Sequence, residues 1–208
     1  MLFRSIVIIF MGLILGFDTP LFAIQLLWIN LVSDSFPAIA LGLEPPEKDI
    51  MNTKPRNSKK GIFTDGLWSK IIFEGIMVGM LALLVFSIGN KIYGIEVART
   101  MVFVSLGLLE LIHSFNIKSG KSIFKTNILN NKYLIGSLLL GIIAQISVVV
   151  IPDLARIFGV VRLTNIQWIV TVVISILPLP IIELQKWINS LYNTVSFESF
   201  FAKTGAQE

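Results

Sequence analysis

The sequence predicts an all-α protein that crosses a membrane several times, a polytopic bundle of about six helical segments, the first of them partial. Composition gives the first reason: 54% of the 208 residues are hydrophobic, 14% are charged, and the mean hydropathy is +0.81. Soluble domains usually carry about 25% charged residues, so this composition indicates a chain that lies in a bilayer. The second reason is the pattern, in which long apolar runs alternate with short polar and basic stretches.

Two residue types that build many functional sites are scarce. Cysteine is absent and histidine occurs once, at His113. Disulfides and thiolate metal sites are therefore excluded, as are zinc sites that need several histidines of this chain. The net charge is +4 and the pI about 9.4. In a membrane protein such an excess is typical of basic cytoplasmic loops, and we expect no nucleic-acid partner.

The apolar runs set the boundaries of the expected segments. The first run, 5–17, ends at the turn Asp18-Thr19-Pro20 and is shorter than the ~20 residues that a full span needs. We expect a partial transmembrane helix with its outer turn over 1–19, a membrane domain over 20–190 and a polar cytoplasmic tail over 191–208. The full spans are expected at 21–43, 66–89, 97–116, 133–151 and 166–185.

Positive charge predicts the orientation of these spans. The loops 44–65 and 117–132 and the tail hold most of the lysines and arginines. Alternating spans place these three stretches on one side of the membrane, and the positive-inside rule makes that side cytoplasmic. We therefore expect an integral, multi-pass protein of the lipid bilayer with both termini in the cytoplasm.

The span 21–43 carries polar groups at its middle. Asn30, Ser33 and Asp34 follow the spacing i, i+3, i+4, so they share one face of a helix. Pro37 lacks the N–H that would bond the carbonyl of Ser33, which is left free at the same level. A carboxylate at mid-membrane depth costs roughly 2.5–3.5 kcal/mol, so Asp34 is expected to face protein or water and to mark an ion or proton site. The alternative is a polar contact between helices, with a structural kink at the proline.

A second carboxylate, Glu110, lies well inside the span 97–116. With His113 and Asn116 it forms another polar stripe at roughly helical spacing. Two carboxylates and two amides suit a hard cation such as calcium, which takes about 6–8 oxygen ligands, with freed carbonyls completing the set. Two alternatives stay open: Glu110 and His113 satisfying each other as a structural pair, and a proton relay of the kind that pumps use.

One motif identifies a family. It reads Gln25-Leu26-Leu27-Trp28-Ile29-Asn30-Leu31-Val32-Ser33-Asp34, followed by Pro37-Ala38 and Ala40-Leu41-Gly42. This motif closely resembles the sixth transmembrane helix of P-type cation-transporting ATPases, and the next loop is similar to that of the calcium-pump branch. The resemblance covers nearly the whole chain, from the outer half of the fifth helix (5–17) to the tenth, as a C-terminal fragment of such a pump.

The resemblance implies a site and a function. The implied calcium ligands are Asn30, Ser33, Asp34 and Glu110, with the helix broken at Pro37. The implied coupling loop, which contacts the ATP-hydrolysing domains in a complete pump, contains Pro45, Pro46, Asp49 and Arg56. The implied function is the cation-binding membrane domain of an ATP-driven pump, with calcium as the transported ion.

Two departures from the family pattern limit the expected activity. Ser5 stands where calcium pumps of this type usually have a ligating Glu, and Leu2 where they have an Asn. The chain also lacks the phosphorylated Asp-Lys-Thr-Gly motif and any ATP site of the common glycine-rich type, so by itself it is expected not to hydrolyse ATP. A separate upstream chain would supply those domains. The alternatives are an inactive truncated remnant or structural bundle without transport, and a stand-alone proton-coupled carrier.

Overall fold

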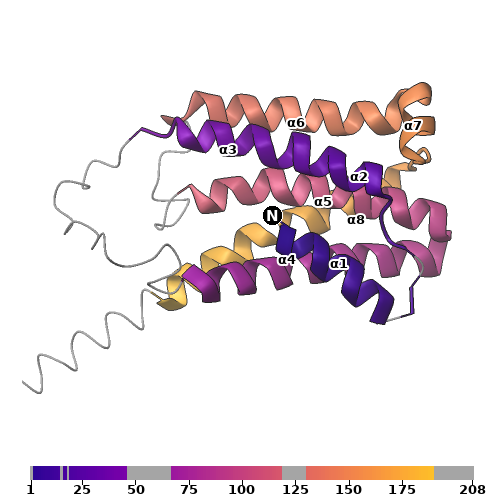
Figure 1. The fold of residues 1–208 in the computed structure, drawn as a ribbon, viewed down its shortest axis with the longest axis horizontal. Coiled ribbons are helices and arrows are strands. Elements are labelled where there is room, and N and C mark those ends of the chain that lie inside the picture. Colours follow the sequence, from indigo (N-terminus) through magenta and orange to yellow (C-terminus); the bar gives the residue numbers. More distant parts are fainter. Residues whose placement is uncertain (1, 15, 18, 46–66, 119–129, 190–208) are drawn as a thin grey trace, which may run out of the picture.

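The computed structural model describes residues 2–14, 16–17, 19–45, 67–118 and 130–189, and among these residues it contains helices and no strands. In chain order the elements are α1 (Leu2–Ile14), α2 (Ala23–Trp28), the π-helical segment η1 (Ile29–Asp34), α3 (Ser35–Gly42), α4 (Leu67–Tyr93), α5 (Ile95–Ile117), α6 (Lys132–Val150), α7 (Pro152–Phe158) and α8 (Asn165–Ile176). The long helices lie side by side as a bundle (Figure 1). The predicted all-α class is confirmed.

The helices have the lengths that the apolar runs predict. In the part of the chain that the structure describes, four stretches are long and apolar enough to cross a membrane: Ala23–Gly42, Leu67–Tyr93, Lys132–Val150 and Asn165–Asn189. The helix α5 has 23 residues, which is also enough to span, and every side chain from Thr100 to Leu111 is buried. The helix α1, with 13 residues, corresponds to the expected partial segment. The helix α1 begins at mid-length of the bundle (Figure 1).

The core of the bundle is built around α5, which contacts α4, α6, α8 and η1. Glycines allow these helices to approach closely. A Cβ atom added at Gly89 of α4 would lie 2.8 Å from the Cα atom of Ala98, and one at Gly141 of α6 would lie 2.5 Å from the side chain of Leu111. Lipid is as apolar as the bundle interior, so close packing of this kind is what favours helix association in a membrane.

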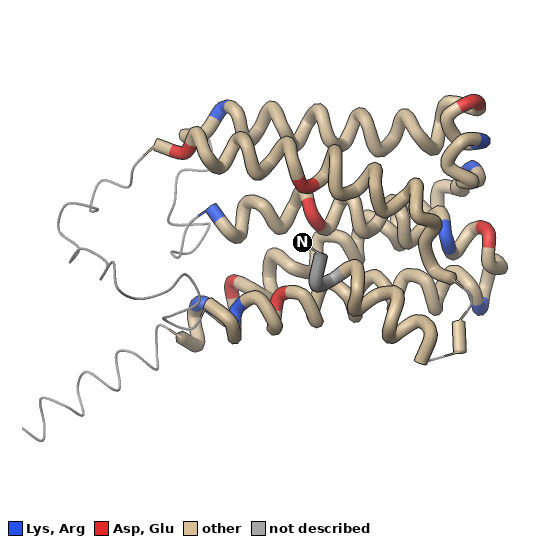
Figure 2. The backbone as a smooth tube through the Cα atoms, viewed as in Figure 1, with Lys and Arg blue, Asp and Glu red and all other residues tan. Residues whose placement is uncertain are grey.

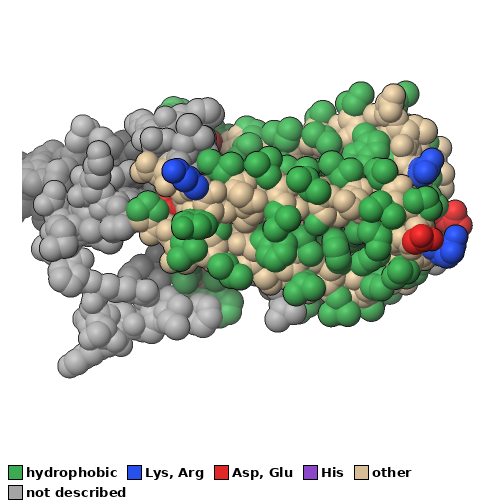
Figure 3. Space-filling model, turned by 90° about the horizontal axis from the view of Figure 1, so that it is seen from above, with side chains coloured by type: hydrophobic (Ala, Val, Ile, Leu, Met, Phe, Trp, Pro, Cys, Tyr) green, Lys and Arg blue, Asp and Glu red, His purple; other side chains and the backbone are tan. Residues whose placement is uncertain are grey.

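The outer surface of the bundle is apolar. Exposed large hydrophobic side chains occur on several spans, among them Leu31, Ile39, Met80 and Ile143, each more than 60% exposed. Figure 3 shows hydrophobic side chains covering the long face of the molecule, with charged side chains near its ends. A surface of this kind is stable against lipid tails and not against water. The bundle is therefore that of an integral membrane protein.

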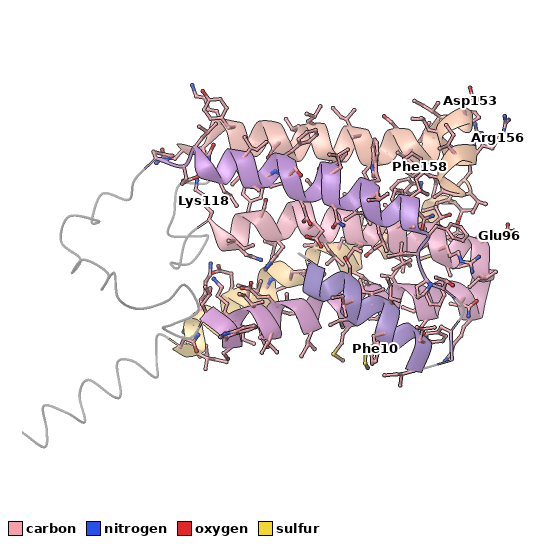
Figure 4. The ribbon with its side chains drawn as sticks, viewed as in Figure 1. Phe10, Glu96, Lys118, Asp153, Arg156 and Phe158 are labelled. Carbon is pink, nitrogen blue, oxygen red and sulfur yellow. The ribbon has the colours of Figure 1, made fainter. Side chains whose placement is uncertain are left out.

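Most charged residues gather at the two ends of the bundle (Figure 2). Figure 4 shows Lys118 at one end and Glu96, Asp153 and Arg156 at the other. We call the end with Lys118 the loop end. There α3 and α5 end and α4 and α6 begin, so the described helices place the flanks of both basic loops at one end, as alternating spans require.

Candidate cation-binding site

The span Ala23–Gly42 stays helical but changes its hydrogen-bond pattern in the middle. Its start is capped by Gln25, whose Oε1 atom accepts a hydrogen bond from the backbone N–H of Phe22 at 3.0 Å. Residues Ile29–Asp34 then form the π-helical segment η1. The helix α3 begins at Ser35, which places Pro37 in its first turn, where a missing N–H is tolerated. Single π-helical turns are rare and frequently lie at functional sites.

The sequence-predicted ligands lie on η1 and α5, which pack against each other. Asn30, Ser33 and Asp34 are all on η1, and Glu110 is on α5. Asp34 is 4% exposed and Glu110 is 5% exposed, while Asn30 is partly buried. Figure 2 shows acidic residues at mid-length of the bundle, where η1 passes α5. Two carboxylates are thus buried inside a bundle whose outer surface is apolar.

The neighbours of Glu110 along α5 fix its direction. Three residues earlier, Gly107 faces α6, because a Cβ atom there would lie 2.7 Å from Cδ of Gln145. Three residues later, His113 faces α4, where its Nε2 atom lies 3.4 Å from Oε2 of Glu74. Side chains three residues apart on an α-helix differ in direction by about 60°. Glu110 lies three residues from each of these two neighbours, so its side chain points between α6 and α4.

Ser33 adds a neutral oxygen to this region. Its Oγ atom is buried and has no hydrogen-bond partner among the described residues. A buried polar atom in that condition costs about 1–3 kcal/mol, so natural proteins seldom retain one without a use. The neighbouring carbonyl of Asn30, by contrast, accepts a hydrogen bond of 3.1 Å from Oγ of Ser35. The hydroxyl beside Asp34 therefore remains available as a ligand.

The donor set restricts which cation can bind. Among the described residues, no three His, Cys, Asp or Glu side chains come close enough together to hold a metal ion. A site here depends instead on two carboxylates together with hydroxyl, amide and backbone oxygens. That set suits calcium, which binds neutral as well as charged oxygen ligands, better than zinc, whose sites mostly contain histidine and cysteine.

A second polar cluster lies nearer the loop end. Nε2 of His113 lies 3.4 Å from Oε2 of Glu74 on α4, and Nζ of Lys70 lies 3.7 Å from the other oxygen of Glu74. The Glu110–His113 pair stays a prediction. Spacing along α5 could not reveal Glu74, because it belongs to another helix.

Asn116, the third residue of the predicted stripe, contacts the last span. Its Nδ2 atom donates to the carbonyl of Pro178 at 3.3 Å, and Nζ of Lys186 donates to its backbone carbonyl at 3.2 Å. Asn116 therefore faces the second half of the last span, on the side of α5 away from α6. Asn116 and Glu110 therefore point in different directions from α5, and the two do not form one stripe toward η1.

The loop end of the span 23–42 is tied to both neighbouring helices. Nδ2 of Asn131, the residue that caps α6, donates to the carbonyl of Ala40 at 2.8 Å and to Oε2 of Glu44 at 2.6 Å. The other oxygen of Glu44 lies 3.0 Å from Nζ of Lys118, at the end of α5. The sequence analysis assigned no role to these polar residues, although an Asn directly before an apolar run is a recognisable N-cap signal for a helix.

The remaining predicted residues fall outside this region. Pro45 follows α3 and is exposed. Pro46, Asp49 and Arg56, as well as the tail 191–208, lie outside the described residues. Ser5 is partly buried on α1, which packs against α4.

Comparison with known proteins agrees with the fold. The family model described as "Cation transporting ATPase, C-terminus" matches residues 18–188. Calcium-transporting ATPase 1 of Bacillus cereus is 40% identical over 202 residues, which cover 88% of this chain and 23% of that protein. The calcium-transporting ATPase of Bacillus subtilis is 36% identical over 176 residues, covering 84% of this chain and 20% of the relative.

A plant relative matches in the same way. Calcium-transporting ATPase 8, plasma membrane-type, of Arabidopsis thaliana is 30% identical over 183 residues, which cover 82% of this chain and 17% of the relative. The chain thus spans 23% or less of the length of each of these three relatives. The all-helical membrane bundle, the motif on η1 and these matches together show that the chain belongs to the cation-transporting ATPase C-terminal family, in the calcium-pump branch of the P-type ATPases.

Proposed function

We propose that this chain is the ion-binding membrane part of an ATP-driven calcium pump. The observation that carries the proposal is the enclosure of Asp34 and Glu110, 4% and 5% exposed, on two helices that pack together inside a bundle whose outer surface is apolar. Ionisable groups at this depth are expensive, and the general reading is that they serve ion or proton movement. The relatives' descriptions as calcium-transporting ATPases support calcium as the ion.

Each predicted ligand has a separate task in this proposal. Asp34 and Glu110 supply negative charge from two helices, so binding the ion fixes η1 relative to α5. Asn30 and Ser33 supply neutral oxygens on the face of η1 that carries Asp34. Side chains provide only part of the about 6–8 oxygens that calcium takes, and backbone carbonyls near the π-helical turn supply others.

The loop end is the cytoplasmic side in this proposal, because the basic loops leave from it. The loop that begins at Pro45, and contains Pro46, Asp49 and Arg56, couples the bundle to the ATP-hydrolysing domains of a complete pump. Those domains belong to the remainder of such a pump, which a separate upstream chain would supply as partner. ATP hydrolysis is not assigned to any residue of this chain.

The test is calcium binding by the full chain in lipid nanodiscs, measured by equilibrium dialysis with radioactive calcium. We expect saturable binding, weakened at least about tenfold by Asp34→Asn and by Glu110→Gln, which corresponds to about 1.4 kcal/mol for each lost carboxylate. Glu96→Gln is the matched control, because Glu96 is an exposed acid at the other end of the same helix. Its affinity should equal that of the unchanged chain.

The alternative, a bundle without transport function, gives a different result. It predicts no saturable binding by the unchanged chain, or binding that Asp34→Asn and Glu110→Gln leave intact. Either outcome would remove the proposed ligand set. Circular dichroism on the same samples shows whether each variant keeps its helical content, so loss of folding is not mistaken for loss of a ligand.

A further inference from the structure

Gln145 is a fully buried amide in the second half of α6, 0% exposed, on a helix that carries none of the proposed ligands. Its Oε1 atom accepts a hydrogen bond of 3.2 Å from Nε1 of Trp28, and its Nε2 atom donates one of 3.0 Å to the carbonyl of Phe103. One side chain of α6 thus connects the other two helices. Trp28 is the last residue of α2, directly before η1, and Phe103 lies two turns before Glu110 on α5.

The backbone of α5 is shaped to accept this amide. A Cβ atom at Gly107 would lie 2.7 Å from Cδ, 2.9 Å from Oε1 and 3.0 Å from Nε2 of Gln145. The amide therefore lies flat against the backbone of α5, one turn before Glu110. A side chain at position 107 would displace it.

The bridge needs a group with a donor and an acceptor on one planar end. The indole of Trp28 can only donate, and the carbonyl of Phe103 can only accept. A glutamine amide meets both requirements with one side chain. A glutamate would place an oxygen against the carbonyl of Phe103, and an aliphatic side chain would leave the indole N–H without its partner.

We propose that Gln145 is a positioning residue of the cation site, which sets the spacing between η1 and Glu110 by bridging Trp28 and Phe103. The inference rests on the proposed calcium site and deepens it. The loop end of the same span is held separately, through Asn131, Glu44 and Lys118. Gln145 therefore controls the end of η1 that adjoins Trp28, and the proposed ligands lie between the two connections.

The experiment measures calcium affinity of the full chain in nanodiscs after Gln145→Met, which keeps the length of the side chain and removes the amide. We expect the dissociation constant to rise about tenfold, the lower part of the range seen when a group that orients metal ligands is lost. The maximal number of bound calcium ions should stay unchanged, because the ligands themselves remain.

Gln25→Met is the matched control. Gln25 is equally buried, at 0% exposure, and its amide also makes two hydrogen bonds, to the backbone of Phe22 and to the carbonyl of Phe158. Those bonds connect the start of α2 to the end of α7 and do not reach α5. Both variants should therefore lose similar thermal stability, while Gln145→Met alone should lose calcium affinity.

A double-mutant cycle tests whether the bridge acts as one unit. Trp28→Phe removes the indole N–H and keeps an aromatic ring beside Phe158, which now lies 5.1 Å from the Trp28 ring between centroids. If the bridge is one unit, Trp28→Phe weakens calcium binding as Gln145→Met does, and the double variant is no weaker than either single variant. Should Gln145→Met fail to fold, Trp28→Phe carries the comparison with Gln25→Met.

Three outcomes decide the inference. Equal loss of affinity in Gln145→Met and Gln25→Met would overturn it, because general loosening would then explain both. Unchanged affinity in Gln145→Met, in a sample where Asp34→Asn has lost binding, would overturn it and leave the proposed function intact. Unchanged affinity in Asp34→Asn would instead overturn the proposed function, and the inference about Gln145 with it.

Discussion

Two spans of this bundle contain prolines and polar residues, yet they use them differently. The span Ala23–Gly42 passes from α2 through η1 to α3 without leaving the helix, and Pro37 stands in the first turn of α3. The span Asn165–Asn189 is interrupted, because α8 ends at Ile176 and the helix resumes at Pro178. The first span leaves the hydroxyl of Ser33 without a hydrogen-bond partner among the described residues.

In the second span, polar side chains form hydrogen bonds with the protein. The hydroxyl of Thr171 donates to the carbonyl of Gln167 at 2.7 Å, and that of Ser175 donates to Thr171 at 2.7 Å and lies 3.1 Å from the hydroxyl of Ser105. The carbonyl of Pro178 accepts from Asn116. A proline in a span therefore does not identify a ligand site. What distinguishes the first span is the buried hydroxyl of Ser33 next to the buried Asp34, and the ligand proposal rests on that difference.

The largest effect that tests this comparison is expected at Asn116. Replacing it with Leu removes the hydrogen bond that its Nδ2 atom donates to the carbonyl of Pro178, which connects α5 to the last span. We expect the free energy of unfolding to fall by about 0.6–1.7 kcal/mol, measured in mixed detergent micelles, with calcium affinity unchanged. A tenfold loss of affinity would show that the second span belongs to the ion site, and the comparison would fail.

At Ser33 we expect a loss of calcium affinity without a loss of stability. Ser33→Ala removes an oxygen that bonds nothing among the described residues, so stability should stay the same or rise slightly. Calcium affinity should fall by about tenfold, or about 1.4 kcal/mol, if the hydroxyl is a ligand. Ser175→Ala is the matched control on the second span: it should cost about 0.6 kcal/mol of stability and no affinity. Identical behaviour of the two alanine variants would remove the distinction between the spans.

Sequence reasoning reached most of the fold because apolar runs measure spans directly. The run 133–151 became α6 at Lys132–Val150, and 97–116 became α5 at Ile95–Ile117, since length and hydropathy decide such elements. It did not reach the π-helical pattern of η1, because hydrogen-bond register depends on how neighbouring helices pack. It also assigned no role to Gln145, whose meaning depends on two residues from other helices.

The sequence also predicted part of the candidate site. Asp34 and Glu110 stand out as carboxylates in apolar runs, and burial of both is what the structure adds. Contacts with other helices could not be predicted, as His113 shows: Glu74, which lies 3.4 Å from its Nε2 atom, belongs to α4. Periodicity locates a residue on its own helix, and contacts between helices need the packed structure.

The smallest expected effect on stability, and the most specific for the comparison, concerns the prolines themselves. In Pro37→Ala and Pro178→Ala the greater freedom of the unfolded chain lowers stability by about 0.4–1 kcal/mol. The better fit of alanine in a helix opposes this loss, so we expect only a small net change in stability. Pro37→Ala also introduces an N–H that can bond the carbonyl of Ser33, which favours an ordinary α-helical turn over η1. Calcium affinity should then fall in Pro37→Ala and remain unchanged in Pro178→Ala, measured in the same nanodiscs. Equal affinity in the two variants would mean that the π-helical turn makes no contribution to binding, and that side chains alone distinguish the first span from the second.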